Sequence, residues 1–204
     1  MDLSLLFATA TGLLAGIVHT LAGPDHLAAV APLAASVPKR RWLPGLFWGA
    51  GHGVGVWTVG VVALALRGVL PVTALSSWSE RLVGAVLVGV GLWGLRRALR
   101  SHLPGHSHSE KPGRSAVWIG ALHGLAGSSH ILGILPALAL PSIAASIGYV
   151  LGFGVGSAGA MASFSGALGW LAGRIARRGL SAYRFALGTL SVLAVAVGGF
   201  WLVR

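Results

Sequence analysis

The sequence contains no cysteine, no asparagine and no glutamine, and only four acidic residues among 204. The absence of cysteine excludes disulfide exchange, thiolate nucleophiles and thiolate metal sites. Charged residues make up 9% of the chain, whereas a soluble domain carries about 25%. Hydrophobic residues make up 55%, and the mean hydropathy is +0.81. We therefore expect an all-α integral membrane protein.

The net charge of +11 is distributed in short basic blocks between apolar runs. This is the positive-inside pattern of membrane proteins rather than a nucleic-acid-binding face. The first, third and fifth linkers hold most of the basic residues, namely Lys39, Arg40, Arg41, Arg96, Arg97, Arg100, Lys111, Arg114, Arg174, Arg177, Arg178 and Arg184. We predict these linkers in the cytoplasm and both termini outside. The expected location is the plasma (inner) membrane, with the lipid bilayer and not nucleic acid as partner.

Six apolar segments are long enough to span a bilayer, at about 20 residues each. They lie near 3–22 (continuing to 36), 43–66, 80–98, 115–139, 142–172 and 183–203. The first lacks the basic region of a cleaved signal peptide, so we expect a retained helix. As one helix, residues 3–36 would measure about 50 Å, beyond a hydrocarbon core of about 30 Å. Either this helix is tilted and broken, or residues 25–36 form a half-helix that folds back.

Three ionisable residues, His19, Asp25 and His26, lie inside the first apolar run. Such groups are costly at membrane depth, and they usually mark a functional site. Between them, Gly23-Pro24 cannot continue a regular helix without a break. Ordinary packing of a satisfied histidine is the alternative, but three such groups beside a helix break favour a function. If the helix were continuous, His19 and His26 would lie about two turns apart on one face.

An internal repeat links this run to the second half of the chain. Without gaps, Gly16, His19, Gly23, His26 and Pro32 align on Gly120, His123, Gly127, His130 and Pro136. Each copy has three spans, an odd number, so the copies must cross the membrane in opposite directions. Inverted repeats with broken helices and a site near the midplane are typical of secondary transporters. We predict a single transmembrane domain, 1–204, built as a 3+3 inverted repeat (1–98 and 115–204) with broken first and fourth helices.

Two further groups of histidines are candidates for metal binding. His52 lies among glycines spaced four apart, 49/53 and 51/55, which let another helix backbone approach closely. It is either a ligand or a polar contact between helices. The cytoplasmic linker 99–114 holds His102, His106 and His108. This tract either collects metal ions or is an ordinary solvated loop.

The predicted pocket is rich in imidazole and poor in oxygen ligands. Its members are His19, Asp25, His26, His52, His123 and His130. Such donors suit Ni²⁺, Co²⁺, Zn²⁺ or Cu²⁺, whereas Mg²⁺ and Ca²⁺ prefer several oxygen ligands. Metal and protons compete for imidazole nitrogens, which offers a coupling to a proton gradient. The ion would be the substrate, with no permanently bound cofactor.

The run His19-Thr-Leu-Ala-Gly-Pro-Asp25-His26 resembles the His/Asp-His signature in an early transmembrane helix of the nickel/cobalt transporter (NiCoT/NicO) superfamily. It is most similar to the short, UreH-like membrane branch. The resemblance implies a polytopic permease for Ni²⁺ or Co²⁺, with His19, Asp25 and His26 as signature positions. Five residues separate His19 from Asp25, where the family motif has four. The family's later carboxylate-bearing motifs have no counterpart in this chain.

We therefore predict a membrane transporter of a divalent transition-metal cation, nickel or cobalt, and not an enzyme. Neither a Gly-x-Ser-x-Gly elbow nor a His-Glu-x-x-His motif is present. One alternative is an exporter of the same ions. Another is a non-transporting membrane protein that binds haem or metal and aids metalloenzyme maturation. The sequence leaves open which ion moves, in which direction, and the oligomeric state.

Overall fold

The computed structural model describes residues 3–37, 40–65, 72–100, 112–126, 133, 136–137 and 139–203. These residues form helices and no strand, which confirms the all-α prediction for the described part of the chain. The helices are α1 (Leu3–Ala22), α2 (Pro24–Ser36), α3 (Leu43–Ala65), α4 (Val72–Arg100), α5 (Pro112–Leu125), α7 (Ile143–Ala176) and α8 (Leu180–Val203). The predicted count of six is wrong, because seven helices occur in the described residues alone.

The helix boundaries explain the difference in count. The first predicted segment is two helices, since Gly23 has an extended backbone (φ −85°, ψ 106°) and α2 begins at Pro24. Proline suits this first position, where its missing N–H would have no helical partner. The fourth predicted segment, 115–139, contains most of α5, which ends at Leu125, and its predicted break near 127 falls among residues outside the described part of the chain. The third is too short, because α4 already begins at Val72.

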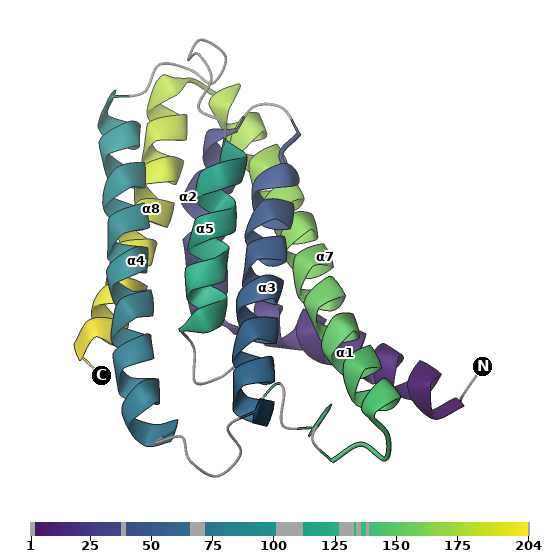
Figure 1. The fold of residues 1–204 in the computed structure, drawn as a ribbon. Helices are drawn as coiled ribbons and strands as arrows, with labels where there is room; N and C mark the ends of the chain where they lie inside the picture. Colours follow the sequence, from purple (N-terminus) through teal and green to yellow (C-terminus); the bar gives the residue numbers. More distant parts are fainter. Residues whose placement is uncertain are drawn as a thin grey trace.

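The outer surface and the helix lengths are those of a multi-pass membrane protein. Four described stretches are long and apolar enough to cross a bilayer: α1, Glu80–Arg100 of α4, α7 and α8. Large apolar side chains point outward, including Phe7 (70% exposed) and Phe185 (77% exposed). Soluble monomers rarely expose apolar surface on this scale. Figure 1 shows the upright helices gathered around α2 and α5, with α1 crossing toward the lower right.

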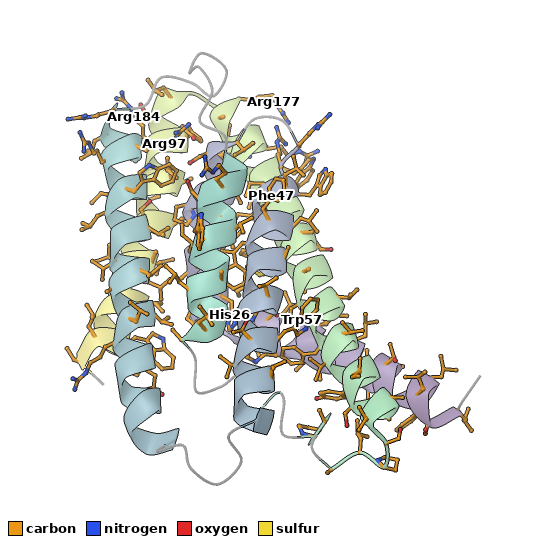
Figure 2. The ribbon with its side chains drawn as sticks, viewed as in Figure 1. His26, Phe47, Trp57, Arg97, Arg177 and Arg184 are labelled. Atoms are coloured by element: carbon orange, nitrogen blue, oxygen red, sulfur yellow. The ribbon has the colours of Figure 1, made fainter. Side chains whose placement is uncertain are left out.

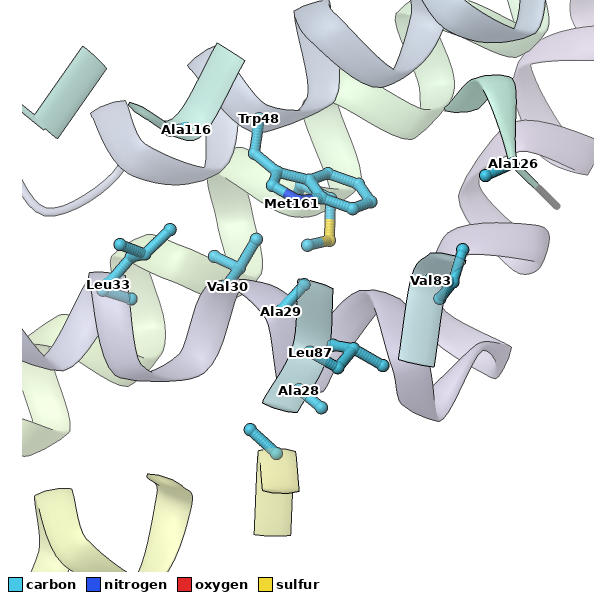
Figure 3. Close-up of a cluster of buried hydrophobic side chains, with 12 residues drawn as sticks. Ala28, Ala29, Val30, Leu33, Trp48, Val83, Leu87, Ala116, Ala126 and Met161 are labelled. Atoms are coloured by element: carbon cyan, nitrogen blue, oxygen red, sulfur yellow. The ribbon is translucent and has the colours of Figure 1, made fainter. Parts of the chain in front are cut away.

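Helix α2 is the core of the molecule. It packs against α3, α4, α5, α7 and α8, and every residue from 28 to 36 is buried. Around it lies a cluster of buried side chains that includes Val30, Leu33, Trp48, Leu87 and Met161 (Figure 3). The predicted break at Gly23-Pro24 therefore produces a separate half-helix, which turns away from α1 and runs behind α5 (Figure 1).

The carbonyl end of α2 is held by polar side chains from two neighbouring helices. Tyr183 of α8 donates its hydroxyl to the carbonyl of Ala35 (3.2 Å). Arg97 of α4 approaches the carbonyl of Ser36 (Nη2···O 3.5 Å). A cation at this position also complements the negative end of the helix dipole. Side chains of α4 and α8 thus hold the C-terminal end of α2.

Glycines line two of the tightest helix contacts, α1 with α7 and α3 with α5. The contact residues are Gly12, Gly16, Gly152 and Gly156 in the first pair and Gly51, Gly55, Gly120 and Gly124 in the second. At each of them a Cβ would overlap a backbone atom of the opposing helix. The predicted close approach at the 51/55 pair is therefore confirmed. In the predicted repeat, α1 corresponds to α5 and α3 corresponds to α7, so the contact between α1 and α7 corresponds to the contact between α5 and α3. The inverted repeat itself stays a prediction.

Basic residues collect at one end of the bundle. Figure 2 shows Arg97, Arg177 and Arg184 at this end, where α4 and α7 finish and α8 begins. Both chain ends, marked in Figure 1, lie away from it. The three basic linkers were predicted to share one side of the membrane, and the arginines of the third and fifth linkers do lie together. Which compartment this end faces stays a prediction.

Candidate metal centre

Four helices bring one carboxylate and four imidazoles together at the break between α1 and α2. His19 lies in the last turn of α1, and Asp25 and His26 lie in the first turn of α2. His52 comes from α3 and His123 from the last turn of α5. All the histidines in the described part of the chain belong to this cluster. The remaining predicted candidates, His102, His106, His108 and His130, lie outside the described residues.

Asp25 joins two of the imidazoles. Its Oδ1 lies 3.1 Å from Nδ1 of His26, and its Oδ2 lies 3.0 Å from Nε2 of His123. With a proton on each of these nitrogens, both rings donate to the carboxylate. This is the arrangement by which carboxylates orient metal-binding histidines, leaving the other ring nitrogen available to an ion. Asp25 therefore connects α2 to α5 and sets the orientation of both rings.

His26 lies at the centre of the cluster. Its ring centroid is 4.8 Å from that of His19, 5.0 Å from that of His52 and 4.8 Å from that of His123. In a continuous helix, His19 and His26 would be separated by about 10.5 Å along the axis. The helix is not continuous, so this spacing does not apply, and the predicted break at Gly23 brings the first turn of α2 beside the last turn of α1.

Two groups of three residues have metal-ligand spacing. In the first group, His19, His26 and His52, the potential ligand atoms all lie within 4.8 Å of one another. In the second group, Asp25, His26 and His123, the same limit holds. Donors bound to one ion at about 2.1 Å lie about 3.4 Å apart in a tetrahedron. Small side-chain adjustments would therefore bring either group into ligand geometry.

Two aromatic side chains form walls of the cluster. Trp48 stacks on His52, with ring centroids 4.9 Å apart and an interplanar angle of 11°, and it is fully buried. Phe153 of α7 lies 5.2 Å from the ring of His19. Sequence reasoning missed Trp48, although its position four residues before His52 places both side chains on one face of α3. Phe153 was noted only as the residue that replaces His52 in the repeat.

The cluster is buried except on the side of His19. Asp25 is 8% exposed, and His26, His52 and His123 are at most 1% exposed. His19 is half-buried, and the neighbouring Pro24 is exposed. A carboxylate in an apolar interior is unfavourable unless it is hydrogen-bonded. Here the two imidazoles and the positive N-terminal end of α2 stabilise the charge.

Gly23 is required by the cluster as well as by the break. A Cβ at this position would overlap Nδ1 of His26 and would lie 2.9 Å from Oδ1 of Asp25. Any other residue would therefore displace the pair that carries the ligands. The sequence identified Gly23 only as part of the helix break, together with Pro24.

The predicted residues His19, Asp25, His26, His52 and His123 thus lie in one place, and their donors can hold a metal ion. The first group offers nitrogen donors alone, and the second offers two nitrogens and one carboxylate. Both sets suit borderline divalent ions from cobalt to zinc better than magnesium or calcium. Binding itself stays a prediction.

No family model and no solved structure matches this chain. Several known proteins are nevertheless similar to it in sequence. The chain is 35% identical to the chloroplast proteins FOR GROWTH AND FERTILITY 1 and 2 of Arabidopsis thaliana, over 78% and 76% of its own length. It covers 48% and 45% of those proteins, so it spans about half their length. It is also 29% identical to the urease accessory protein UreH of Bacillus sp. (strain TB-90), over 82% of this chain and 78% of that protein. The chain is thus a distant homologue of UreH.

Proposed function

We propose that this protein is a transporter of a divalent transition-metal cation, nickel or cobalt, in the plasma (inner) membrane. One observation carries the proposal. A carboxylate and four imidazoles from four helices are buried together at a helix break inside an apolar bundle. Ionisable groups are costly there, and a substrate path is the common reason for their presence.

The donor set and its exposure support an ion that enters and leaves. Nitrogen-rich sites without thiolate select borderline ions, and the motif at residues 19–26 resembles that of nickel/cobalt permeases. His19 is half-buried while the other members are buried, so an ion would reach the cluster first through His19. The apolar cluster around Trp48, Val30 and Met161 lies beyond it. Passage to the arginine-rich end would require that cluster to open.

A second candidate function is a metal-binding membrane protein that aids the maturation of a metalloenzyme without transport. The name of the relative UreH, a urease accessory protein, favours it. In that case the histidines would be fixed ligands of haem or of a metal ion. An optical spectrum of the purified protein tests whether the histidines bind haem, because bound haem has an intense absorption band.

The test of transport is uptake of radioactive nickel by cells that express the protein. His26→Ala removes the central imidazole, and we expect uptake to fall to the level of cells without the protein. His106→Ala, in the linker, is the matched histidine control and should retain uptake. If His26→Ala transports normally while His106→Ala does not, the buried cluster is not the transport site.

The direction of transport is measured separately. In proteoliposomes loaded with unlabelled nickel, a transporter accumulates labelled nickel by counterflow. Reconstituting the protein with imposed gradients in each direction then distinguishes an importer from an exporter of the same ions. Binding of nickel without counterflow would favour the accessory role instead.

A further inference from the structure

The two groups with metal-ligand spacing have one residue in common, His26. We propose that the cluster holds one ion at either of two neighbouring positions, and that His26 is the ligand shared by both. The inference rests on the proposed function only in taking a transition-metal ion as the substrate. It adds that the ion moves within the cluster by exchanging the partners of His26.

The first position is formed by His19, His26 and His52 from α1, α2 and α3. It offers imidazole donors only. Because His19 is half-buried, this position is the one nearer to the surface. Trp48 stacks on the ring of His52, and the tilted ring of Phe153 lies 5.2 Å from that of His19.

The second position is formed by Asp25, His26 and His123, from α2 and α5. All three residues are at most 8% exposed, so this position lies deeper in the bundle. Nδ1 of His26 lies 3.1 Å from Asp25, on the side of this position. The other ring nitrogen, Nε2, is the donor that we assign to the first position, so the ring proton changes from Nδ1 to Nε2 when the ion moves to the second.

A single site with five ligands does not fit the spacing. No group within the 4.8 Å limit, among the described residues, combines a member of the His19/His52 pair with a member of the Asp25/His123 pair. Simultaneous occupancy does not fit either. A neutral imidazole has one nitrogen lone pair free for a metal, so His26 cannot bind two ions at once, and two divalent ions so close together would repel each other strongly in a buried site.

Cobalt binding to the purified full-length protein in detergent tests this proposal, because the visible bands of Co²⁺ report its ligands. We expect one Co²⁺ per chain. The variants His19→Ala and His52→Ala should share one spectrum, typical of mixed nitrogen and oxygen ligands. The variants His123→Ala and Asp25→Asn should share a different, nitrogen-only spectrum. His26→Ala should weaken binding about 100-fold or more, since it belongs to both positions. Gly188→Ala in α8, where a Cβ would have no neighbour within 4 Å, should match the unaltered protein.

Three results would overturn the proposal: two Co²⁺ per chain, one spectrum common to all four variants, or full-strength binding by His26→Ala. Elution in size exclusion verifies that each variant is folded. X-ray absorption of the unaltered protein adds a measurement without mutation, with between two and three imidazoles per Co²⁺ expected and four contradicting the two positions. Because binding is measured without transport, two spectra in a protein that shows no counterflow would leave the two positions standing and reject the transporter.

Discussion

Asp25 is the residue on which the geometry of the cluster depends. Its two carboxylate oxygens face imidazoles from two different helices, at 3.1 Å and 3.0 Å. An asparagine at this position could accept a hydrogen bond through its oxygen only, and its amide group would need acceptors that the imidazole N–H groups do not provide. The carboxylate of Asp25 therefore holds two rings in addition to being a candidate ligand.

Gly23 offers a test of this orientation in which no ligand residue is itself substituted. In Gly23→Ala the new Cβ would overlap Nδ1 of His26, so the His26–Asp25 pair must move. Because displaced ligands and their orienting partners lower metal affinity by about 10- to 100-fold, we expect a loss of this size in nickel binding measured by titration calorimetry.

The matched control for this variant is Gly159→Ala in α7, where a Cβ would have no neighbour within 4 Å. It should bind nickel like the unaltered protein. Equal affinity in both alanine variants would mean that the spacing between Gly23 and His26 has no influence on the site.

At the level of helices, the position of the imidazoles is set by backbone contacts through glycine. The Cβ of an alanine at Gly120 would overlap the carbonyl of Trp48 and approach the N–H of His52. The contact between α5 and α3 therefore carries His123, His52 and Trp48 as one unit. The contact between α1 and α7 does the same for His19 and Phe153 through Gly16.

Alanine substitution should have opposite effects on stability at two helix positions. Gly120→Ala forces α3 and α5 apart, and overpacking of this kind costs about 1–3 kcal/mol. Gly188→Ala in α8 meets no neighbour within 4 Å. It should stabilise the helix by up to about 1 kcal/mol, because alanine has the higher helix propensity.

Thermal unfolding of the purified variants measures this difference. The midpoint should fall for Gly120→Ala and remain level or rise for Gly188→Ala. A higher unfolding midpoint for both variants would show that the contact between α3 and α5 can accommodate an added methyl group.

On the scale of the whole molecule, charge distinguishes the two ends of the bundle. The end that carries Arg97, Arg177 and Arg184 is basic, and the first residue of α1 and the last residue of α8 lie away from it (Figures 1 and 2). Because basic loops are retained in the cytoplasm, this asymmetry predicts the orientation of the protein in its membrane.

The absence of native cysteine makes the orientation directly measurable. In intact cells, a membrane-impermeant maleimide should label Leu3→Cys at the exposed start of α1. It should label Ser181→Cys, at the basic end near Arg184, only after the cells are opened. The reverse pattern would place the basic end outside and would contradict the positive-inside prediction.

Much of the secondary structure could be predicted, because it depends on local chemistry. Hydropathy gave the bounds of α1, α3 and α8 to within three residues. The Gly23-Pro24 pair gave the break before α2, since proline lacks the N–H that a continuous helix needs. The number of helices could not be obtained in this way, because hydropathy does not distinguish one long apolar segment from two helices joined at a break.

The composition of the candidate site could be predicted only in part. Costly ionisable residues in apolar runs indicated His19, Asp25, His26, His52 and His123 without any structure. Their mutual arrangement could not be predicted, because it depends on how four helices pack. The pairing of Asp25 with His123, across 98 residues of sequence, is one example. The stacking of Trp48 on His52 is another, since the same spacing on α3 would also suit two lipid-facing residues.

The enclosed position of α2 has a consequence for how the protein is made. At 13 residues, α2 is about 20 Å long, too short to be held across a bilayer by its own hydrophobicity. Its flanks are covered by α7 and α8, and its last carbonyls are held by Arg97 and Tyr183. These partners emerge from the ribosome long after α2 itself. We therefore expect the second helix in the sequence to be among the last to reach its final place, so that the cluster of histidines at its start is completed only when synthesis of the chain is nearly finished.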